Sequence, residues 1–424
     1  MRILFVTYPE KPVFQYLVTM GWALRTAGHE VRFASQGNFV DVITAAGLTA
    51  VPTGSNPQPW RVTHLSAAQR RIERAGLPAP YDAAAAPERA TWPYLRDGYA
   101  DHVVGRYVME SLPMIDELVQ FACAWSPDLV IWEPNCMAGP IAAKVSGCAH
   151  ARLLFGLDIF GATRELFHRL RAQQPPDDQL DALGNWFGKQ LAPYGMEPSD
   201  DMATGNFTID QFPASLQLTT GLHQVRTRYV PFGGRAVVPS WLRTPPQRPR
   251  IGFTMGFSAT EHFDGYPIDV GDALRELAEL DVEVVATVAT SEQHRLGPLP
   301  DTVRVVPSVP LHALASTCTA MVHHAGAATM ATVSLSGIPQ LAVHHHFDQP
   351  EFGRLLEAHG AGLALDSSEA TGAAVRDRVS RLLTEPAFRA RAADLRAEMQ
   401  ALPSPNEVVD ELVDLAEALR PEQP

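Results

Sequence analysis

The sequence predicts an α/β protein built from two doubly wound domains that face each other across a cleft. The chain has 424 residues, which is too long for one ordinary core and suits two domains of roughly 200 residues each. Strand-like apolar runs alternate with helix-like segments in both halves, which is typical of parallel sheets covered by helices. Between the halves, residues 226–250 hold five prolines and no clear periodicity, which indicates a linker.

The first series of elements starts at the N-terminus. Residues 2–7 form an apolar run that predicts a buried strand, and apolar residues from Phe14 to Leu24 then recur with helical spacing. Gly28 is expected to end that helix and to lead into a second strand. The same strand and helix pattern returns at residues 127–134, 138–147 and 148–155. Residues 55–110 are less regular, and we expect them to cover the end of this first sheet.

A second series follows the linker. Strand-like runs are expected at 251–257, 281–289, 303–309, 320–323 and 361–366, with a helix near 269–280. We therefore expect a first Rossmann-like domain at 1–225, a linker at 226–250, a second Rossmann-like domain at 251–402 and a terminal helix at 403–424 that could pack back on the first domain. Ligands of such folds bind at the carboxyl ends of the strands.

Composition excludes some classes of function. The chain has 34 basic and 47 acidic residues and a net charge of −13, so we expect no binding to nucleic acid or to anionic membranes. Its four cysteines have no metal-like spacing, which favours reduced thiols in a cytoplasmic protein. The start of the chain lacks the apolar core of a signal peptide, and no run of about 18 apolar residues is present.

One segment, "VHHAGAATMATVSLSGIPQLAVHHHFDQPEF" at 322–352, carries most of the chemistry. It predicts a strand, a tight turn of very small residues and a helix that stops at Gly337. Amide groups at such a helix start are available to an anion, because they lie at the positive end of the helix dipole. A diphosphate therefore fits the turn better than a metal ion does, with contacts from His324, Ala325, Gly326, Ala327, Ala328 and Thr329.

The histidines of this segment do not predict a metal site. His344, His345 and His346 are consecutive on an expected strand, so their rings should alternate between two faces and cannot all bind one ion. His323 and His324 should diverge for the same reason. We expect the three consecutive rings to face solvent at a strand end.

Motifs along nearly the whole chain carry a resemblance to one enzyme family. "VHHAGAAT", "GIPQLAV", "FDQP" and "GAGL" look like the donor site of GT-B glycosyltransferases of the family-1 type. "RILFVTYPEKPVFQYLVTMGWALRTAGHEVRFASQ", "PDLVIWEP" and "RPRIGFTMG" are similar to actinobacterial glycosyltransferases that attach deoxysugars to polyketide antibiotics, and among them to the activator-dependent branch. The resemblance implies the GT-B fold and inverting, metal-independent transfer from a thymidine diphosphate deoxysugar, with no cofactor.

The resemblance also implies roles for residues. His324 would donate to the diphosphate, together with Gly326, Ala327, Ala328 and Thr329. Asp348 and Gln349 would hold sugar hydroxyls, although Asp348 could instead cap the helix that follows it. Ser258 would face the phosphate and Val309 the nucleotide base. Partners implied are the nucleotide sugar, an apolar aglycone and a helper protein related to cytochrome P450; a homodimer is a further expectation.

The sequence departs from the family pattern at two positions. The family's catalytic histidine falls on Val13, and valine cannot take a proton from an acceptor hydroxyl. The second position is in the phosphate loop, where the family typically has a glycine and this chain has Ala328. Three explanations stay open for Val13. Another group is the base, with Glu133 first, Asp158 second and Glu10 third; or the acceptor needs little activation; or the protein has lost catalysis and acts as a partner.

A GT-B nucleotide-sugar epimerase is the alternative from another class. That reaction needs carboxylates and a histidine around one substrate and no open acceptor pocket. The aromatic and Pro-rich region at 55–110 favours a bulky apolar acceptor instead. We expect Val13, Trp60, Trp92 and Phe160 to line the pocket for this acceptor.

Overall fold

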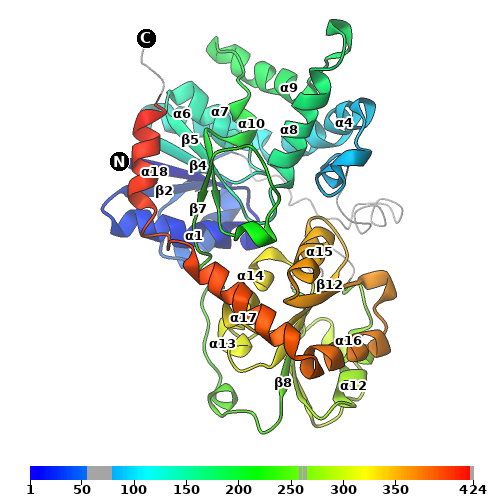
Figure 1. Cartoon of the computed structure of the whole chain (residues 1–424). Helices are drawn as coiled ribbons and strands as arrows, with labels where there is room; N and C mark the ends of the chain where they lie inside the picture. The colour runs from blue at the N-terminus through cyan, green and yellow to red at the C-terminus, as the bar shows by residue number, and fades with distance from the viewer. Residues whose placement is uncertain (55–78, 257–259, 261–264, 421–424) are drawn as a thin grey trace.

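The computed structural model describes residues 1–54, 79–256, 260 and 265–420, and it contains one sheet in each half of the chain (Figure 1). The strand order is β3-β2-β1-β4-β5-β6-β7 in the first sheet and β10-β9-β8-β11-β12-β13 in the second. All strand pairs of both sheets are parallel. The order reverses between β1 and β4 and between β8 and β11, so ligand crevices are expected at the carboxyl ends of these strands.

The strands are short and apolar because helices cover both faces of each sheet. Those of the first half are β1 Arg2–Val6, β2 Glu30–Ser35, β3 Ala50–Pro52, β4 Leu129–Trp132, β5 Ala149–Leu153, β6 Phe207–Asp210 and β7 Gln224–Arg226. Those of the second half are β8 Arg250–Thr254, β9 Glu283–Thr287, β10 Val303–Val306, β11 Ala320–His323, β12 Gln340–His344 and β13 Gly362–Asp366.

The helices begin and end where local chemistry predicts. Helix α1 has Pro12 in its first turn, where no amide donor is needed, and it is followed by Gly28 at φ +95°. The helices of the first half are α1 Lys11–Thr26, α2 Val40–Ala45, α4 Trp92–Gly98, α5 Val104–Glu110, α6 Ile115–Trp125, α7 Ala138–Ser146, α8 Ile159–Arg171, α9 Ala182–Leu191 and α10 Asp201–Thr204.

The second half carries the remaining helices, and its last two lead back to the first half (Figure 1). Helix α18 contacts β5, Arg420 pairs with Asp128, and the Arg228 amide donates to the Pro403 carbonyl at 2.7 Å. The domain limits given above stay a prediction. These helices are α12 Val270–Ala278, α13 Leu311–Ala315, α14 Ala327–Ser336, α15 Gln349–His359, α16 Gly372–Thr384, α17 Pro386–Ala401 and α18 Val409–Ala418.

The two halves also meet through aromatic contacts near the carboxyl ends of the strands. The rings of Phe212 and Phe352 lie 5.0 Å apart, and those of Phe160 and Phe347 lie 6.1 Å apart. These pairs place α15 of the second half against the first half.

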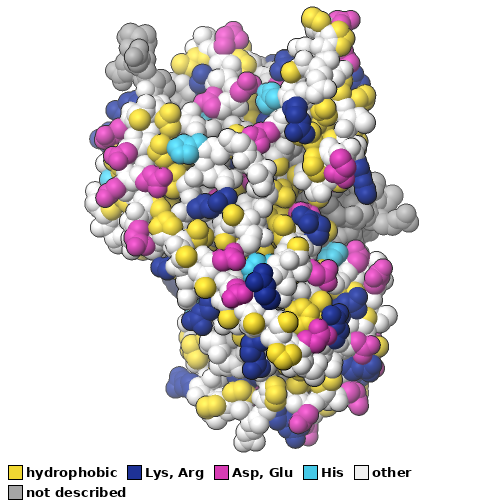
Figure 2. Space-filling model, viewed as in Figure 1, with side chains coloured by type: hydrophobic (Ala, Val, Ile, Leu, Met, Phe, Trp, Pro, Cys, Tyr) yellow, Lys and Arg dark blue, Asp and Glu magenta, His cyan; other side chains and the backbone are white. Residues whose placement is uncertain are grey.

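Acidic and basic side chains are interspersed on the face shown in Figure 2, rather than gathered in one basic patch. Within the described ranges, no helix is long and apolar enough to cross a membrane.

Candidate functional site

The start of α14 presents backbone amides beyond the end of β11. Strand β11 ends at His323, and Gly326 occupies the N-cap position of α14. The first helical hydrogen bond runs from the Met330 amide to the Gly326 carbonyl at 2.9 Å, so the amides of 327–329 have no partner within the helix. Residues 326–329 are partly exposed. This is the geometry in which helix starts bind phosphates.

The turn before α14 is strained. Ala325 is fully buried and has φ +60°, a left-handed conformation that costs an alanine about 1–2 kcal/mol. Phe347, immediately before α15, has φ +54°. Such outliers concentrate at functional sites, because the surrounding structure must hold them in place. Here they precede the two helices expected to bind the diphosphate and the sugar.

The His324 ring lies between two glycines. A Cβ atom added at Gly256 would come within 2.5 Å of this ring, and one added at Gly326 within 2.3 Å, so both positions require glycine for space. Burial lowers the pKa of His324 to about 4, although the Thr254 backbone opposes the shift. The ring is therefore neutral at pH 7. Its Nδ1 atom is buried and has no hydrogen-bond partner among the described residues, which leaves it available to a ligand.

The neighbouring His323 has a structural role. Its Nε2 lies 2.9 Å from Gln340 Oε1, and its Nδ1 accepts from the Ala325 amide at 3.0 Å. Burial lowers the pKa of His323 to about 3. The two adjacent rings have different neighbours, as the alternation along a strand predicts, and His323 holds the turn on which His324 stands.

Asp348 occupies the N-cap position of α15, yet its side chain makes no capping hydrogen bond. It reaches instead to the first half, where the Leu157 amide donates to Oδ2 at 3.3 Å. Burial raises the pKa of Asp348 to about 7, and no basic side chain of the described residues offsets this. A buried carboxylate without a cation is suited to hydroxyl donors. Gln349, beside it, accepts from the His345 amide at 3.2 Å.

The consecutive histidines differ from the expectation in one respect. Strand β12 ends at His344, so the alternation does not extend to His345 and His346. His345 is buried rather than solvent-facing, and its ring centroid lies 4.1 Å from that of His346. The expectation was wrong for His345 because the strand ends one residue before it, so strand alternation no longer sets the direction of its ring. In the part of the chain described, no three potential metal ligands lie together.

The two carboxylates expected first as bases are fully buried and already bonded. Glu133 accepts from the Tyr8 amide at 3.0 Å and from the Asn135 amide at 2.7 Å. Burial raises the pKa of Glu133 to about 8, because these two amides offset the desolvation only in part. Glu133 therefore links the loops after β1 and β4 through hydrogen bonds, which is a structural role.

Asp158 is committed in the same way. It accepts from Arg152 at 2.7 Å and from the Gly161 amide at 2.8 Å, which caps α8. Both of its oxygens are therefore used within the protein. The assignment of either Glu133 or Asp158 as the base stays a prediction that this geometry does not favour.

The structure describes three of the four residues expected around an acceptor. Val13 is buried in the first turn of α1, and Phe160 packs at the boundary of the two halves. Trp92 is buried against Phe167, with ring centroids 5.1 Å apart, so it belongs to the core between α4 and α8. Val309, expected near the base, is partly buried and packs against the apolar cluster that includes Leu242 and Leu314. Trp60 and Ser258 lie outside the described residues.

Sequence reasoning missed two features. Gly156, in the loop after β5, approaches Asp348 closely, and no local pattern indicates a contact between residues so far apart in the sequence. Glu110 is a buried carboxyl group on α5 whose Oε1 accepts from Arg106 at 3.0 Å, while Oε2 has no hydrogen-bond partner among the described residues. Its isolated position in an irregular region gave no signal.

Family models match both halves of the chain. The model described as erythromycin biosynthesis protein CIII-like, N-terminal domain, matches residues 22–256, and the corresponding C-terminal domain matches residues 272–415. The chain is 40% identical to the 10-deoxymethynolide desosaminyltransferase of Streptomyces venezuelae, over 98% of this chain and 97% of that protein. It is 41% identical to the aclacinomycin-T 2-deoxy-L-fucose transferase of Streptomyces galilaeus, over 96% and 94% of the two chains.

Solved structures agree with the fold. The glycosyltransferase VinC, in complex with dTDP, is 36% identical and has a TM-score of 0.87, with 99% of this chain and 100% of that chain covered. The spinosyn forosaminyltransferase SpnP is 35% identical, with a TM-score of 0.81 and coverage of 98% and 99%. The chain is thus a glycosyltransferase with the GT-B fold, and it belongs to the erythromycin biosynthesis protein CIII-like family.

Proposed function

We propose that this protein transfers a deoxysugar from a thymidine diphosphate sugar to a polyketide or related aglycone in antibiotic biosynthesis. One observation supports the proposal most: the amides at the start of α14 have no partner within the helix and the buried Nδ1 of His324 has none among the described residues, which suits an anion. Asp348, which leaves its own helix uncapped, supports a sugar contact beside them. The desosaminyl and 2-deoxy-L-fucosyl activities in the names of the two relatives support the sugar class.

The donor binds in one orientation in this proposal. The diphosphate contacts the amides at 326–329, the Thr329 hydroxyl and His324, while Asp348 and Gln349 hold the sugar and Val309 contacts the base. The dTDP in the VinC structure supports thymine as that base. Without a ligand, burial keeps His324 neutral at pH 7, and the neutral ring can offer one N–H donor to the diphosphate.

The reaction is a displacement with inversion. The acceptor oxygen forms a bond to the anomeric carbon as the bond from that carbon to the diphosphate oxygen breaks, and the acceptor proton moves to a base. Val13 cannot take this proton. Glu110 is the better candidate on geometry than Glu133 or Asp158, because one of its buried oxygens lacks a partner. Burial raises the pKa of Glu110, against the effect of Arg106, and a raised pKa makes a carboxylate a stronger base.

Glu110 also lies near the loop that follows β1. Burial and then the Glu110 carboxylate raise the pKa of Tyr8, in that loop, to about 12. The family's histidine would stand just after this loop, at Val13 in the first turn of α1. An acceptor that needs little activation is the second explanation for Val13, and a protein that binds the donor without turnover is the third.

Product analysis separates these functions. The protein is mixed with a thymidine diphosphate sugar, with and without a panel of polyketide aglycones, and with and without a helper protein related to cytochrome P450. Glycosylated aglycone is the expected product. An isomerised nucleotide sugar without acceptor would favour the epimerase, and donor binding with no product under any condition would favour the partner protein. The helper and a homodimer stay predictions from the resemblance.

A further inference from the structure

The loop after β5 brings the first half of the chain against the donor site. The Leu157 amide donates to Asp348 Oδ2 at 3.3 Å, and a Cβ atom added at Gly156 would lie 2.3 Å from the same oxygen. The same added atom would lie 3.8 Å from the Cβ of Ala327, at the start of α14. Gly156 therefore sits between the residues proposed to hold the sugar and those proposed to hold the diphosphate.

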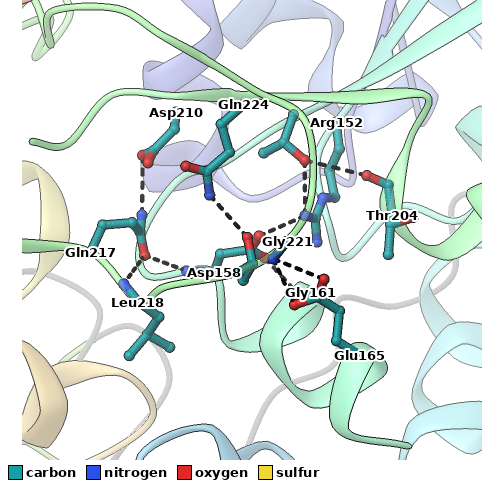
Figure 3. Close-up of polar contacts among 12 residues, drawn as sticks. Arg152, Asp158, Gly161, Glu165, Thr204, Asp210, Gln217, Leu218, Gly221 and Gln224 are labelled. Atoms are coloured by element: carbon teal, nitrogen blue, oxygen red, sulfur yellow. Dashed lines mark hydrogen bonds and ion pairs between the residues drawn. The ribbon is translucent and has the colours of Figure 1, made fainter. Parts of the chain in front are cut away.

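Buried polar side chains bind the backbone of this loop, and Figure 3 shows the contacts around Asp158 and Gln217. The Gln217 side chain accepts from the Asp158 amide at 2.8 Å and donates to the Gly156 carbonyl at 3.3 Å and to Asp210 at 3.1 Å. Arg152 fixes Asp158 in turn at 2.7 Å. These hydrogen bonds hold the backbone on both sides of Leu157, so a shift of the loop that made room for a side chain at 156 would have to break them.

Backbone conformation does not explain the glycine. Gly156 has no φ in the left-handed region, so an alanine could adopt its backbone angles. The requirement is for space alone, and the atom that fills that space is the carboxylate of Asp348 in the opposite half.

We propose that Gly156 is a specificity-determining position that sets the room beside Asp348 for the transferred sugar. The inference rests on the proposed donor site. With a sugar bound, Asp348 turns its oxygens to the sugar hydroxyls, and a larger residue at 156 would push this carboxylate out of the position that the sugar requires. At that point the first half has only the backbone of Gly156. It leaves space for the sugar and has no side chain that would need a sugar hydroxyl as a hydrogen-bond partner.

The test compares Gly156→Ala with Gly105→Ala, an exposed glycine of the same half at which an added Cβ meets no atom within 4 Å. Calorimetry measures the Kd of thymidine diphosphate and of thymidine diphosphate glucose for each protein. Gly156→Ala should raise the Kd of the sugar nucleotide at least tenfold relative to that of thymidine diphosphate, which should change less than twofold. Gly105→Ala should change neither. Equal binding of the sugar nucleotide by Gly156→Ala and the parent, or equal losses of both ligands, would overturn the inference.

A double-mutant cycle with Asp348→Ala covers the case in which Gly156→Ala folds poorly. Removing the carboxylate frees the space, so the double variant should regain the thermal stability and should bind the sugar nucleotide like Asp348→Ala alone. Additive losses would contradict the proposed contact. Failure of the parent to bind thymidine diphosphate would instead sink the donor site itself, which keeps the two failures distinct.

Discussion

The carboxyl edges of the two sheets differ in how they treat buried ionisable groups. In the first half, Glu133 and Asp158 use both of their oxygens within the protein, on loop amides and on Arg152. In the second half, His324 keeps a buried nitrogen without a partner among the described residues, and Asp348 leaves its helix uncapped and makes one long bond across the gap. Burial shifts pKa values at both edges, so a shifted pKa does not separate the two cases.

This contrast indicates that hydrogen-bond satisfaction distinguishes two kinds of buried polar residue: structural ones, whose polar atoms are bonded within the protein, and ligand contacts, whose polar atoms lack such bonds. A buried polar group that lacks a partner costs about 1–3 kcal/mol, and a protein keeps it where a ligand supplies the missing bond. Applied to the first half, the same criterion passes over Glu133 and Asp158 and retains Glu110 and Asp210, each with one buried oxygen that accepts no hydrogen bond from the described residues. Asp210 differs in that Arg226 lies 3.8 Å from that oxygen. Four substitutions test this difference between the two sheet edges.

The largest effect is expected at Glu110. Glu110→Gln removes the proposed base and should lower kcat by about 10²–10⁴-fold, because a general base contributes about that much. The Kd of thymidine diphosphate should not change. Glu88→Gln, an exposed acid of the same half, is the control. Turnover at the parent's rate would remove Glu110 from the mechanism and would favour an acceptor that needs no base.

His324→Ala should weaken thymidine diphosphate binding about 10- to 100-fold, since a hydrogen bond to a charged ligand contributes about 1.5–3 kcal/mol. Titration calorimetry measures this change. The exposed His312→Ala on α13 should leave the affinity as it is. An unchanged Kd in His324→Ala would show that the unpartnered nitrogen does not mark the ligand.

Glu133→Gln should affect stability rather than turnover. The amide would place an N–H donor against a loop amide that now donates to the carboxylate, at a cost of about 1–3 kcal/mol in the free energy of unfolding. Denaturant unfolding measures this loss, and kcat of the folded variant should stay within about fivefold of the parent. A large drop in kcat with unchanged stability would restore Glu133 as the base.

The smallest effect concerns pH and Asp348. Its folded pKa of about 7 exceeds the ordinary value for aspartate, so the stability linked to its proton is fully present at low pH and is lost as pH rises through 7. Asp348→Asn removes this loss and should raise the free energy of unfolding by about 2 kcal/mol more at pH 8.5 than at pH 5.5, because about 1.5 pH units lie between pH 5.5 and the folded pKa. Thermal unfolding at the two values checks the sign; a larger gain at pH 5.5 would contradict the assigned pKa.

The sequence predicts the alternating elements well, because strand and helix periodicities are local. The strand ending at His323, the turn and the helix ending before Gly337 all follow from the residue types in one segment. Apolar periodicity likewise indicates β1 and α1, and the small residues indicate the amide-rich helix start. These features need no knowledge of distant parts of the chain.

The remainder depends on contacts between distant residues. Nothing near Glu133 reveals that Tyr8 and Asn135 supply its two donors, and nothing near Gly156 reveals Asp348. The burial of His345 depends on where β12 ends, which the run of three histidines does not fix. Satisfaction of buried groups, the property that separates the two edges, is set by tertiary packing.

A crystal structure of the protein with thymidine diphosphate tests the central claim most directly. We predict the diphosphate within hydrogen-bond distance of the amides at 326–329 and of His324, with Asp348 facing the terminal phosphate side of the gap. A nucleotide bound elsewhere, with this helix start free of phosphate oxygens, would contradict the account.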